Sequence, residues 1–532
     1  MSIINDENGK PYKVHLCKTN IAQNNNKFYD MEMLDNGGSR AHRFSVKLIN
    51  GRIGYRGVTH FKEFGDLDKA KSFFDAKFFE KTHLHWEERQ DEPVPNKYVV
   101  VDLMDNNSMK KEEEEGEEDA KKEEEEEEEE KKPQTKKTRG RKKKAEEEVE
   151  VKKEESEEEE AEDVDQKVKD LMRCICDEDV HLGLLKQLKF NEAYGKPIDC
   201  LSLAQLQTGY DILATIETSI GGKKAARSGT RSRAAPTLSK NPGASTHDTN
   251  KYYSLIPHSF GFQVPPKIDT LAKVEAEREL LDALKGSIEA SMEVKDVKKE
   301  KSNKDIYQRL YERLPCHLEP VSEDVAGKIG ECLKMRGPTH FFKLSYLDAF
   351  ELKNPEEAPK PAKRARKSAP STTKRLLWHG TRVTNVFSIL MNGLQMPEGD
   401  RCGLMFGNGV YFANVPTKSA NYCCPEVSKR VFMLLCEVET SNPLVLYQSE
   451  PDADDMMAKK KKLSVYAAGK HRPTETVEIN GIPAFKSGLE QIEEESQLLY
   501  DEYVMFDQDR FKIKYVVEVK VEKITAAEMR GQ

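Results

Sequence analysis

Residues 376–382 read LLWHGTR and mark a change in the character of the chain. The apolar residues at the start of this stretch indicate a buried strand. A histidine and a glycine, His379 and Gly380, stand at its end. Because glycine has no side chain, a ligand can approach the backbone here, and the amide and carbonyl of Gly380 become available to a planar amide. The strand end is therefore a candidate ligand-binding position.

A second segment, residues 406–413, reads FGNGVYFA. It indicates a glycine-flanked strand that presents Tyr411, and its Gly-x-Gly precedes a strand rather than a phosphate-binding helix, which argues against a Rossmann-type dinucleotide fingerprint. The sequence KSANY at 418–422 follows and indicates a short helix that presents Ser419 and Tyr422.

A third segment, residues 501–504, reads DEYV and places Glu502 at the start of a strand. Taken singly, each segment has a plain structural explanation. A histidine at a strand end is commonly a hydrogen-bonding residue, a tyrosine in a strand commonly packs, and a glutamate before a strand is commonly solvated. The order and the glycine-marked contexts of the three segments therefore carry more information than any one residue.

The surrounding sequence is rich in short apolar runs with strand-like alternation. An Asn480-Gly481 pair inside one of them is typical of a tight hairpin turn. The predicted strands are Val431–Val438, Val477–Phe485, Tyr503–Phe506 and Phe511–Val521.

Together these segments closely resemble the catalytic domain of the poly(ADP-ribose) polymerases over nearly all of residues 375–524, and the order His, Tyr, Glu is that family's signature. The resemblance implies a compact mixed α/β ADP-ribosyltransferase domain, placed at 375–532, in which antiparallel strands dominate. It implies a cleft that binds NAD+ as a substrate, with no metal and no tightly bound cofactor.

The resemblance also implies how NAD+ is held. His379 would hydrogen-bond the 2′-hydroxyl of the adenine ribose. The backbone of Gly380 and the hydroxyl of Ser419 would hold the nicotinamide carboxamide. Tyr411 and Tyr422 would stack around the nicotinamide ring, since flat aromatic faces suit a flat ring.

Four further residues receive roles in the same way. Thr381 and Asn385 would line the cofactor side of the cleft. Glu502 would contact the nicotinamide ribose and stabilise the oxocarbenium-like state as nicotinamide leaves, an electrostatic role for a fixed carboxylate. Lys418 would help to place the acceptor.

The whole chain is too polar to be one packed globule, because 34% of its 532 residues are charged and only 37% are hydrophobic. Residues 105–163 are nearly all Glu, Lys and Arg and are expected to be a disordered charged linker. The 10 cysteines form no CxxC pair, which argues against zinc and, with reduced thiols, favours an intracellular protein. No apolar run approaches 18 residues, so we expect no membrane span.

Residues 164–352 are predicted to be an all-α bundle from apolar residues at helical spacing, with a loop insertion at 221–249 and a basic linker at 353–374. The block around Gln205 and the sequence IPHSFG at 256–261 resemble the regulatory domain that precedes the catalytic domain in DNA-dependent family members. The resemblance implies an autoinhibitory bundle that blocks NAD+ until DNA binding loosens it.

Residues 11–104 are predicted to be a small β-sheet domain, with Arg43 and Lys47 forming a basic strand face. They resemble the family's WGR domain, which binds DNA ends through phosphate contacts, but Asn50 stands where that motif has tryptophan. By family match the DNA-binding residues would be Asn24, Asn26, Lys27, Arg52 and Tyr98. The order of domains resembles the short, DNA-dependent type of the family, without zinc fingers.

The fold class expected from these regions is therefore multidomain α+β. The function expected is a nuclear, DNA-strand-break-activated ADP-ribosyltransferase that builds poly(ADP-ribose) on itself and on chromatin proteins, activated by 5′-phosphorylated nicks or ends. Basic clusters at 136–144 and 363–367 would serve as nuclear import signals, DNA-contacting tails or plain solvated linkers. A mono-ADP-ribosyltransferase and a non-catalytic DNA-end-binding scaffold remain as alternatives.

Overall fold

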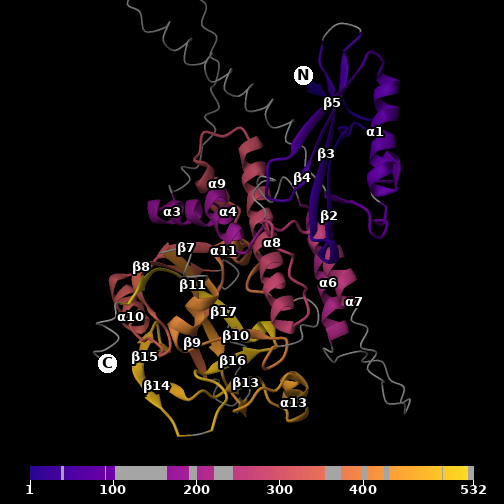
Figure 1. Cartoon of the computed structure of the whole chain (residues 1–532). Coiled ribbons are helices and arrows are strands. Elements are labelled where there is room, and N and C mark those ends of the chain that lie inside the picture. Colours follow the sequence, from indigo (N-terminus) through magenta and orange to yellow (C-terminus); the bar gives the residue numbers. More distant parts are fainter. Residues whose placement is uncertain are drawn as a thin grey trace, which may run out of the picture. The chain divides into compact units, whose positions relative to one another are not determined.

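The computed structural model describes residues 1–37, 41–89, 91–101, 164–190, 201–220, 244–353, 373–397, 404–423, 430–493 and 495–524 (Figure 1). The predicted charged linker and both basic clusters lie outside these residues. Across the described ranges, no helix is long and apolar enough to cross a membrane. Within the same ranges, no group of three or more His, Cys, Asp or Glu side chains could hold a metal ion.

The N-terminal region forms a six-stranded sheet in the order β5-β4-β3-β2-β6, with β1 paired to β3, and one helix, α1. Asp66 caps α1 by accepting a hydrogen bond from the Lys69 amide. One face of the sheet buries Phe74 and Phe78 of α1 together with Trp86. The elements are β1 Ser2–Ile3, β2 Lys13–Asn20, β3 Asn25–Asp35, β4 Phe44–Arg52, β5 Val58–Phe64, α1 Leu67–Thr82 and β6 Val99–Val101.

The opposite face of this sheet packs on the helices that follow. Cys17, Phe28 and Val99 belong to the same apolar cluster as Tyr253 and Leu281 of the helical region. The Thr19 amide donates to the Ser254 hydroxyl at 2.8 Å, and the Ile21 amide donates to the Asn250 side chain at 2.9 Å. The sheet and the helices therefore share one core.

The helical prediction holds for the described residues between 166 and 312. The helices are α3 Gln166–Ile175, α4 Glu178–Gln187, α6 Leu203–Ile220, α7 Ala244–Leu255, α8 Leu271–Lys299 and α9 Ile306–Glu312. Helix α7 begins inside the range predicted as a loop insertion, so that prediction is wrong for residues 244–249. The remainder of the insertion, 221–243, lies outside the described residues.

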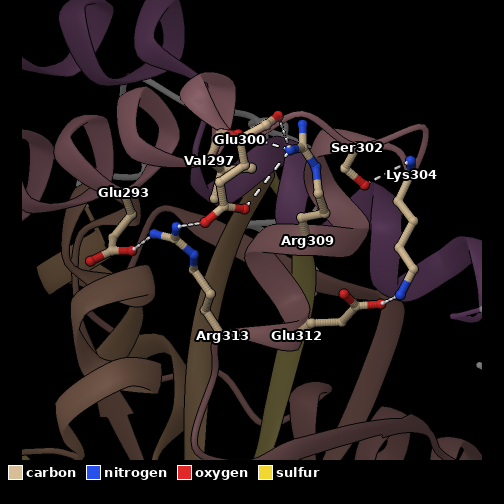
Figure 2. A network of polar contacts seen from close by, with 8 residues as sticks. All are labelled: Glu293, Val297, Glu300, Ser302, Lys304, Arg309, Glu312 and Arg313. Carbon is tan, nitrogen blue, oxygen red and sulfur yellow. Dashed lines mark hydrogen bonds and ion pairs between the residues drawn. The ribbon is translucent and has the colours of Figure 1, made fainter.

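The turn from α8 into α9 is fixed by charged side chains (Figure 2). Arg313 bonds the Glu293 carboxylate at 2.6 Å and the Glu300 carboxylate at 2.5 Å. Arg309 donates to the carbonyls of Val297 at 2.8 Å and Glu300 at 3.1 Å, which satisfies acceptors at the C-terminus of α8. The long helix α8 is thus anchored at this end.

The C-terminal region contains a seven-stranded sheet in the order β14-β15-β9-β11-β17-β8-β7 and a four-stranded sheet in the order β10-β16-β13-β12. The predicted strands are confirmed, and Asn480 and Gly481 adopt φ values of 48° and 78° in the hairpin turn. The strands are β9 Lys374–Gly380, β10 Val410–Phe412, β11 Arg430–Glu439, β12 Pro443–Leu446, β13 Ser464–Ala467, β14 His471–Ile479, β15 Ile482–Gln491, β16 Glu502–Met505 and β17 Phe511–Lys523. The helices between them are α11 Val383–Asn392, α12 Pro416–Ala420 and α13 Ala453–Lys459.

The boundary predicted between the helical and catalytic regions is wrong. Strands β7 His317–Pro320 and β8 Phe342–Lys353 belong to the seven-stranded sheet, where Ala349 of β8 pairs with Val517 of β17. Helix α10, Glu323–Leu333, packs its Ile329 and Leu333 into the core of the same sheet. The C-terminal unit therefore starts near residue 317, because β8 supplies a strand that covers one edge of β17.

Candidate active site

Three short strands bring the predicted catalytic side chains together. Trp378 of β9 forms an antiparallel bridge with Ala413, just past β10. Strand β10 in turn pairs with β16, so that Tyr411 lies opposite Val504. Glu502 is two residues before Val504 and therefore lies on the same face of the paired strands as Tyr411. The negative charge of Glu502 contributes to raising the pKa of Tyr411, after burial, which agrees with this proximity.

The hydrogen bonding of His379 fixes its tautomer. Its Nδ1 lies 2.9 Å from the carbonyl oxygen of Tyr411, and because a carbonyl can only accept, Nδ1 carries the proton. Burial lowers the pKa of His379, so the ring is neutral at physiological pH. Nε2 is therefore a hydrogen-bond acceptor, as the predicted contact with a ribose hydroxyl requires.

Gly380 and Ser419 lie against each other. A Cβ on Gly380 would lie 1.8 Å from the carbonyl oxygen of Ser419, so only glycine fits between β9 and α12. The Ser419 hydroxyl is buried and donates to the Trp378 carbonyl at 3.0 Å. The predicted pair is thus adjacent, although the Ser419 hydroxyl would have to turn from Trp378 to bind a carboxamide.

Tyr411 and Tyr422, the two residues predicted to stack on the nicotinamide ring, differ in how firmly they are held. The Tyr411 hydroxyl donates to the Gly407 carbonyl at 2.8 Å and accepts from the Phe406 amide at 3.1 Å, which fixes the ring. Tyr422 follows α12 in the short 3₁₀ helix Asn421–Cys423 and exposes 57% of its surface. The site is therefore bordered by the hydrogen-bonded ring of Tyr411 and the solvent-exposed ring of Tyr422.

Lys418 is an immediate neighbour of Glu502. Its Nζ lies 2.7 Å from the Glu502 Oε1 and donates to the carbonyls of Tyr500 at 3.2 Å and Asp501 at 3.0 Å. Burial lowers the pKa of Lys418, and the Glu502 charge opposes that shift. The Lys418 ammonium group orients the Glu502 carboxylate and partly neutralises its negative charge.

The Asp501 carboxylate, next to Glu502, is an anchor that sequence reasoning did not single out. It is 2% exposed and accepts hydrogen bonds at 2.7 Å from both the Gly469 amide and the Asn414 side chain. These hydrogen bonds hold the backbone just before β16 in place. The position of Glu502 is therefore set by its backbone as well as by Lys418.

Helix α8 of the helical region covers the neighbouring wall of the site. A Cβ on Gly286 would lie 2.4 Å from the Thr384 carbonyl oxygen and 2.7 Å from the Asn385 side-chain oxygen. Arg382 bonds the Glu279 carboxylate of α8 at 2.6 Å. Asn385 donates to Thr381 at 3.4 Å, so both predicted cofactor-side residues lie next to this helix contact.

Carboxylates of α8 also lie close to the open side of the site. Although much of the Tyr422 ring is exposed, desolvation of its hydroxyl, followed by the charges of Glu502, Glu279 and Glu275, raises the pKa of Tyr422 to about 12. The last two belong to α8. Helix α8 therefore places carboxylates beside the open side of the site, one of which, Glu279, pairs with Arg382.

The Arg52 guanidinium is engaged by acceptors within the protein, and its predicted contact with DNA stays a prediction. Its Nε donates to the Gly261 carbonyl at 2.5 Å, and its terminal nitrogens donate to the Gln263 carbonyl and to both oxygens of Asn24. Asn24 itself donates to the Phe262 carbonyl at 3.3 Å. Both residues join the N-terminal sheet to the segment between α7 and α8.

Asn26 is likewise an interface residue and not a surface one. It is fully buried and donates to the His258 carbonyl at 3.0 Å. Arg43 and Lys47 alternate with the core residues Phe44, Val46 and Leu48, as predicted. Their charges are nevertheless balanced, because they pair with Asp35 and Glu32. Acidic partners of this kind were not visible in the local pattern.

A row of cations remains at one end of the other sheet face. Lys27 lies opposite Lys18 on β2 and opposite Arg52 on β4, and cross-strand partners point to the same face. Charges of Lys97 and Lys27 contribute to lowering the pKa of Lys18, after burial. Tyr98 is half-buried beside Tyr29, with ring centroids 6.3 Å apart. The sequence analysis named Lys27 and Tyr98 in this region but did not name Lys18 or Lys97.

Comparisons with known proteins agree with this architecture. A family model described as the poly(ADP-ribose) polymerase catalytic domain matches residues 322–521. The regulatory domain of the same polymerases matches residues 163–311, and the WGR domain matches residues 12–93. The catalytic match begins before β8, as the sheet topology requires.

Named relatives match over nearly the whole length. The chain is 71% identical to poly(ADP-ribose) polymerase 2 of Caenorhabditis elegans, over 99% of this chain and 100% of that protein. It is 30% identical to poly(ADP-ribose) polymerase 2 of Homo sapiens, over 97% of this chain and 80% of that protein. The corresponding protein of Arabidopsis thaliana is 26% identical, over 96% and 73%.

Proposed function

The chain belongs to the poly(ADP-ribose) polymerase family, and we propose that it transfers ADP-ribose from NAD+ in response to a DNA strand break. It is an NAD+ ADP-ribosyltransferase, and the activity of its family is poly(ADP-ribose) synthesis. We assign the WGR domain to residues 11–104, the regulatory domain to 164–316 and the catalytic domain to 317–532, with the charged segment 105–163 as a linker.

The observation that carries this proposal is the convergence of His379, Tyr411 and Glu502. The acceptor nitrogen of His379 suits a ribose 2′-hydroxyl, and Gly380 lies directly against Ser419, the pair proposed to hold the carboxamide. As the nicotinamide–ribose bond breaks, positive charge develops on the ribose, and Glu502 stabilises it electrostatically. Lys418 holds that carboxylate in place and borders the side from which an acceptor approaches.

The regulatory half of the proposal rests on α8. This helix packs without a gap on α11 at Gly286 and is tied to Arg382 through Glu279. Its carboxylates oppose the NAD+ diphosphate. DNA binding at the WGR domain loosens α8, because the two domains share a core and the Arg52 contacts.

The DNA surface is proposed to be the cation row of Lys18, Lys27 and Lys97, bordered by Tyr98. Lys27 is exposed, Lys18 and Lys97 are partly exposed, and lysines in a row suit phosphates of a nucleic-acid backbone. Arg52 acts mainly through the regulatory segment that it binds. Asn50 lies on the same face as Arg52 and supplies no aromatic surface.

Charge removal in this row tests the surface. We expect Lys18→Ala and Lys27→Ala each to weaken binding to a 5′-phosphorylated nicked duplex and to lower the slope of log Kd against log salt by about 1, since each removes about one phosphate contact. Fluorescence anisotropy at several salt concentrations measures both. Lys69→Ala, on the exposed side of α1, is the matched control and should leave the slope unchanged. An unchanged slope in all three variants would place the DNA surface elsewhere.

We further propose a nuclear location, with chromatin proteins and the chain itself as acceptors. If the chain is a transferase, incubating the purified protein with labelled NAD+ should give protein-bound label. A 5′-phosphorylated nick should stimulate the labelling strongly. Ladders on a denaturing gel distinguish polymer from the single units of a mono-transferase. Absence of protein-bound label would leave only a DNA-binding scaffold.

A further inference from the structure

Two exposed aromatic rings meet where the WGR domain joins the regulatory domain. Tyr55 and Phe262 expose 40% and 74% of their surfaces, and their ring centroids lie 4.6 Å apart at an interplanar angle of 43°. Large apolar side chains exposed as a contiguous pair are characteristic of a binding surface. Neither ring belongs to the NAD+ site.

Both rings are held by defined backbone contacts. Tyr55 follows Gly54, which has φ 88°, and its amide donates to the Arg52 carbonyl at 3.1 Å. Phe262 lies between Gly261 and Gln263, whose carbonyls both accept hydrogen bonds from Arg52. The guanidinium of Arg52 also lies over the Phe262 ring, 5.8 Å from its centroid. A pair that is exposed yet fixed in this way costs little further ordering on binding a ligand.

The charges around the pair identify the class of ligand. Lys27 is the cross-strand partner of Arg52, and Lys18 is the partner of Lys27, so the cation row ends at the aromatic pair. Arg56, next to Tyr55, is exposed as well. A row of cations that leads to open aromatic faces suits a ligand with regularly spaced phosphates and flat faces, which is the chemistry of a nucleic-acid end.

We propose that Tyr55 and Phe262 stack on the terminal base of a DNA break whose backbone lies along Lys27 and Lys18. This inference deepens the proposed function, because it rests on DNA binding by this surface. An intact duplex offers no open base face, so the pair distinguishes an end from continuous DNA.

The pair also connects the DNA end to the catalytic unit. Phe262 lies four residues after His258, whose Nε2 is 2.9 Å from the Glu277 carboxylate of α8. Glu279, on the same helix, binds Arg382 beside the NAD+ site. A base stacked on Phe262 therefore contacts the segment that buttresses α8.

Truncation of each ring in the full chain tests the proposal. We expect Tyr55→Ala and Phe262→Ala each to weaken binding to a 5′-phosphorylated hairpin with one blunt end about tenfold, without changing the salt slope, because stacking and not charge is lost. Phe262→Trp should restore binding. A 2-aminopurine at the terminal position should be quenched by the wild-type chain and not by the alanine variants.

Controls separate the possible outcomes. Phe61→Ala removes a ring of 58% exposure from β5 and should change nothing, and thermal unfolding checks that every variant folds. A closed dumbbell without ends should bind wild type and alanine variants equally. If the wild type prefers open ends but both alanine variants match it, only the stacking proposal fails. If the wild type neither prefers ends nor gains activity from them, the proposed DNA response fails first.

Discussion

Glu502→Gln should lower ADP-ribose transfer about a hundredfold or more and leave no ladder of chains. The change keeps the size of the side chain and removes its negative charge, which is the part that stabilises the positive ribose as nicotinamide departs. Loss of one preorganised electrostatic group typically costs about 10²–10³ in kcat. The measurement is the rate and length distribution of labelled product from NAD+ at saturating nicked DNA.

The ion pair with Lys418 decides how that variant must be controlled. Removing one partner of a buried pair destabilises a fold, but the amide oxygen of glutamine can still accept from Lys418, whose pKa is already lowered by burial. We therefore expect NAD+-competitive binding of nicotinamide and the unfolding midpoint to stay near wild type. Glu478→Gln, exposed on β14 of the same unit, should retain full polymer synthesis. Polymer of ordinary length from Glu502→Gln would refute the role given to this carboxylate.

The sequence could predict where the candidate catalytic residues lie in the strands because their signals are local. His379 and Gly380 end a strand, Tyr411 follows glycines, and Glu502 begins a strand, and the structure places each there. The register between β10 and β16 then fixes which side chains share a face, and this pairing joins segments that are far apart in the sequence. Asp501 was missed for that reason, because its partners Asn414 and Gly469 are distant in sequence.

The WGR surface was harder to predict because a basic residue looks the same whether it faces DNA or another domain. Arg52 contacts Gly261 and Asn26 contacts His258, more than 200 residues away in each case. No pattern inside the first 104 residues reports such partners. Lys18 is the opposite case, since only the pairing of β2 with β3 places it beside Lys27.

The boundary error at β8 has a different cause. Only Leu344, Ala349 and Phe350 of β8 are buried, and polar residues such as Lys343 and Ser345 interrupt its apolar pattern. Because this strand pattern is weak and follows a true helix, α10, the prediction assigned the segment to the helical region. The strand is stabilised by its pairing with β17, a segment about 170 residues later, so local propensity could not reveal it.

Gly286→Ala should raise the activity without DNA about tenfold, because α8 and α11 touch at this glycine with no room for a methyl group. The added Cβ would lie 2.4 Å from the Thr384 carbonyl oxygen, and backbone cannot move aside as a flexible side chain could. Overpacking of this kind costs about 1–3 kcal/mol, which lowers the ratio of docked to undocked α8 by about tenfold and so raises the minor undocked population by about that factor. The rate of NAD+ consumption with and without nicked DNA measures the effect.

Gly183 provides a control that separates the steric clash at Gly286 from the higher helix propensity of alanine. Gly183 in α4 has nothing within 4 Å of an added Cβ, so Gly183→Ala should leave the DNA-independent rate unchanged and stabilise its helix by about 0.5–1 kcal/mol. Because alanine favours both helices equally, only the clash at Gly286 can separate the two variants. If Gly286→Ala instead lowers the DNA-independent and the DNA-stimulated rates together, α8 supports the catalytic fold rather than restraining it. A rise in the DNA-independent rate, with the stimulated rate kept, means that docked α8 is what holds the site closed.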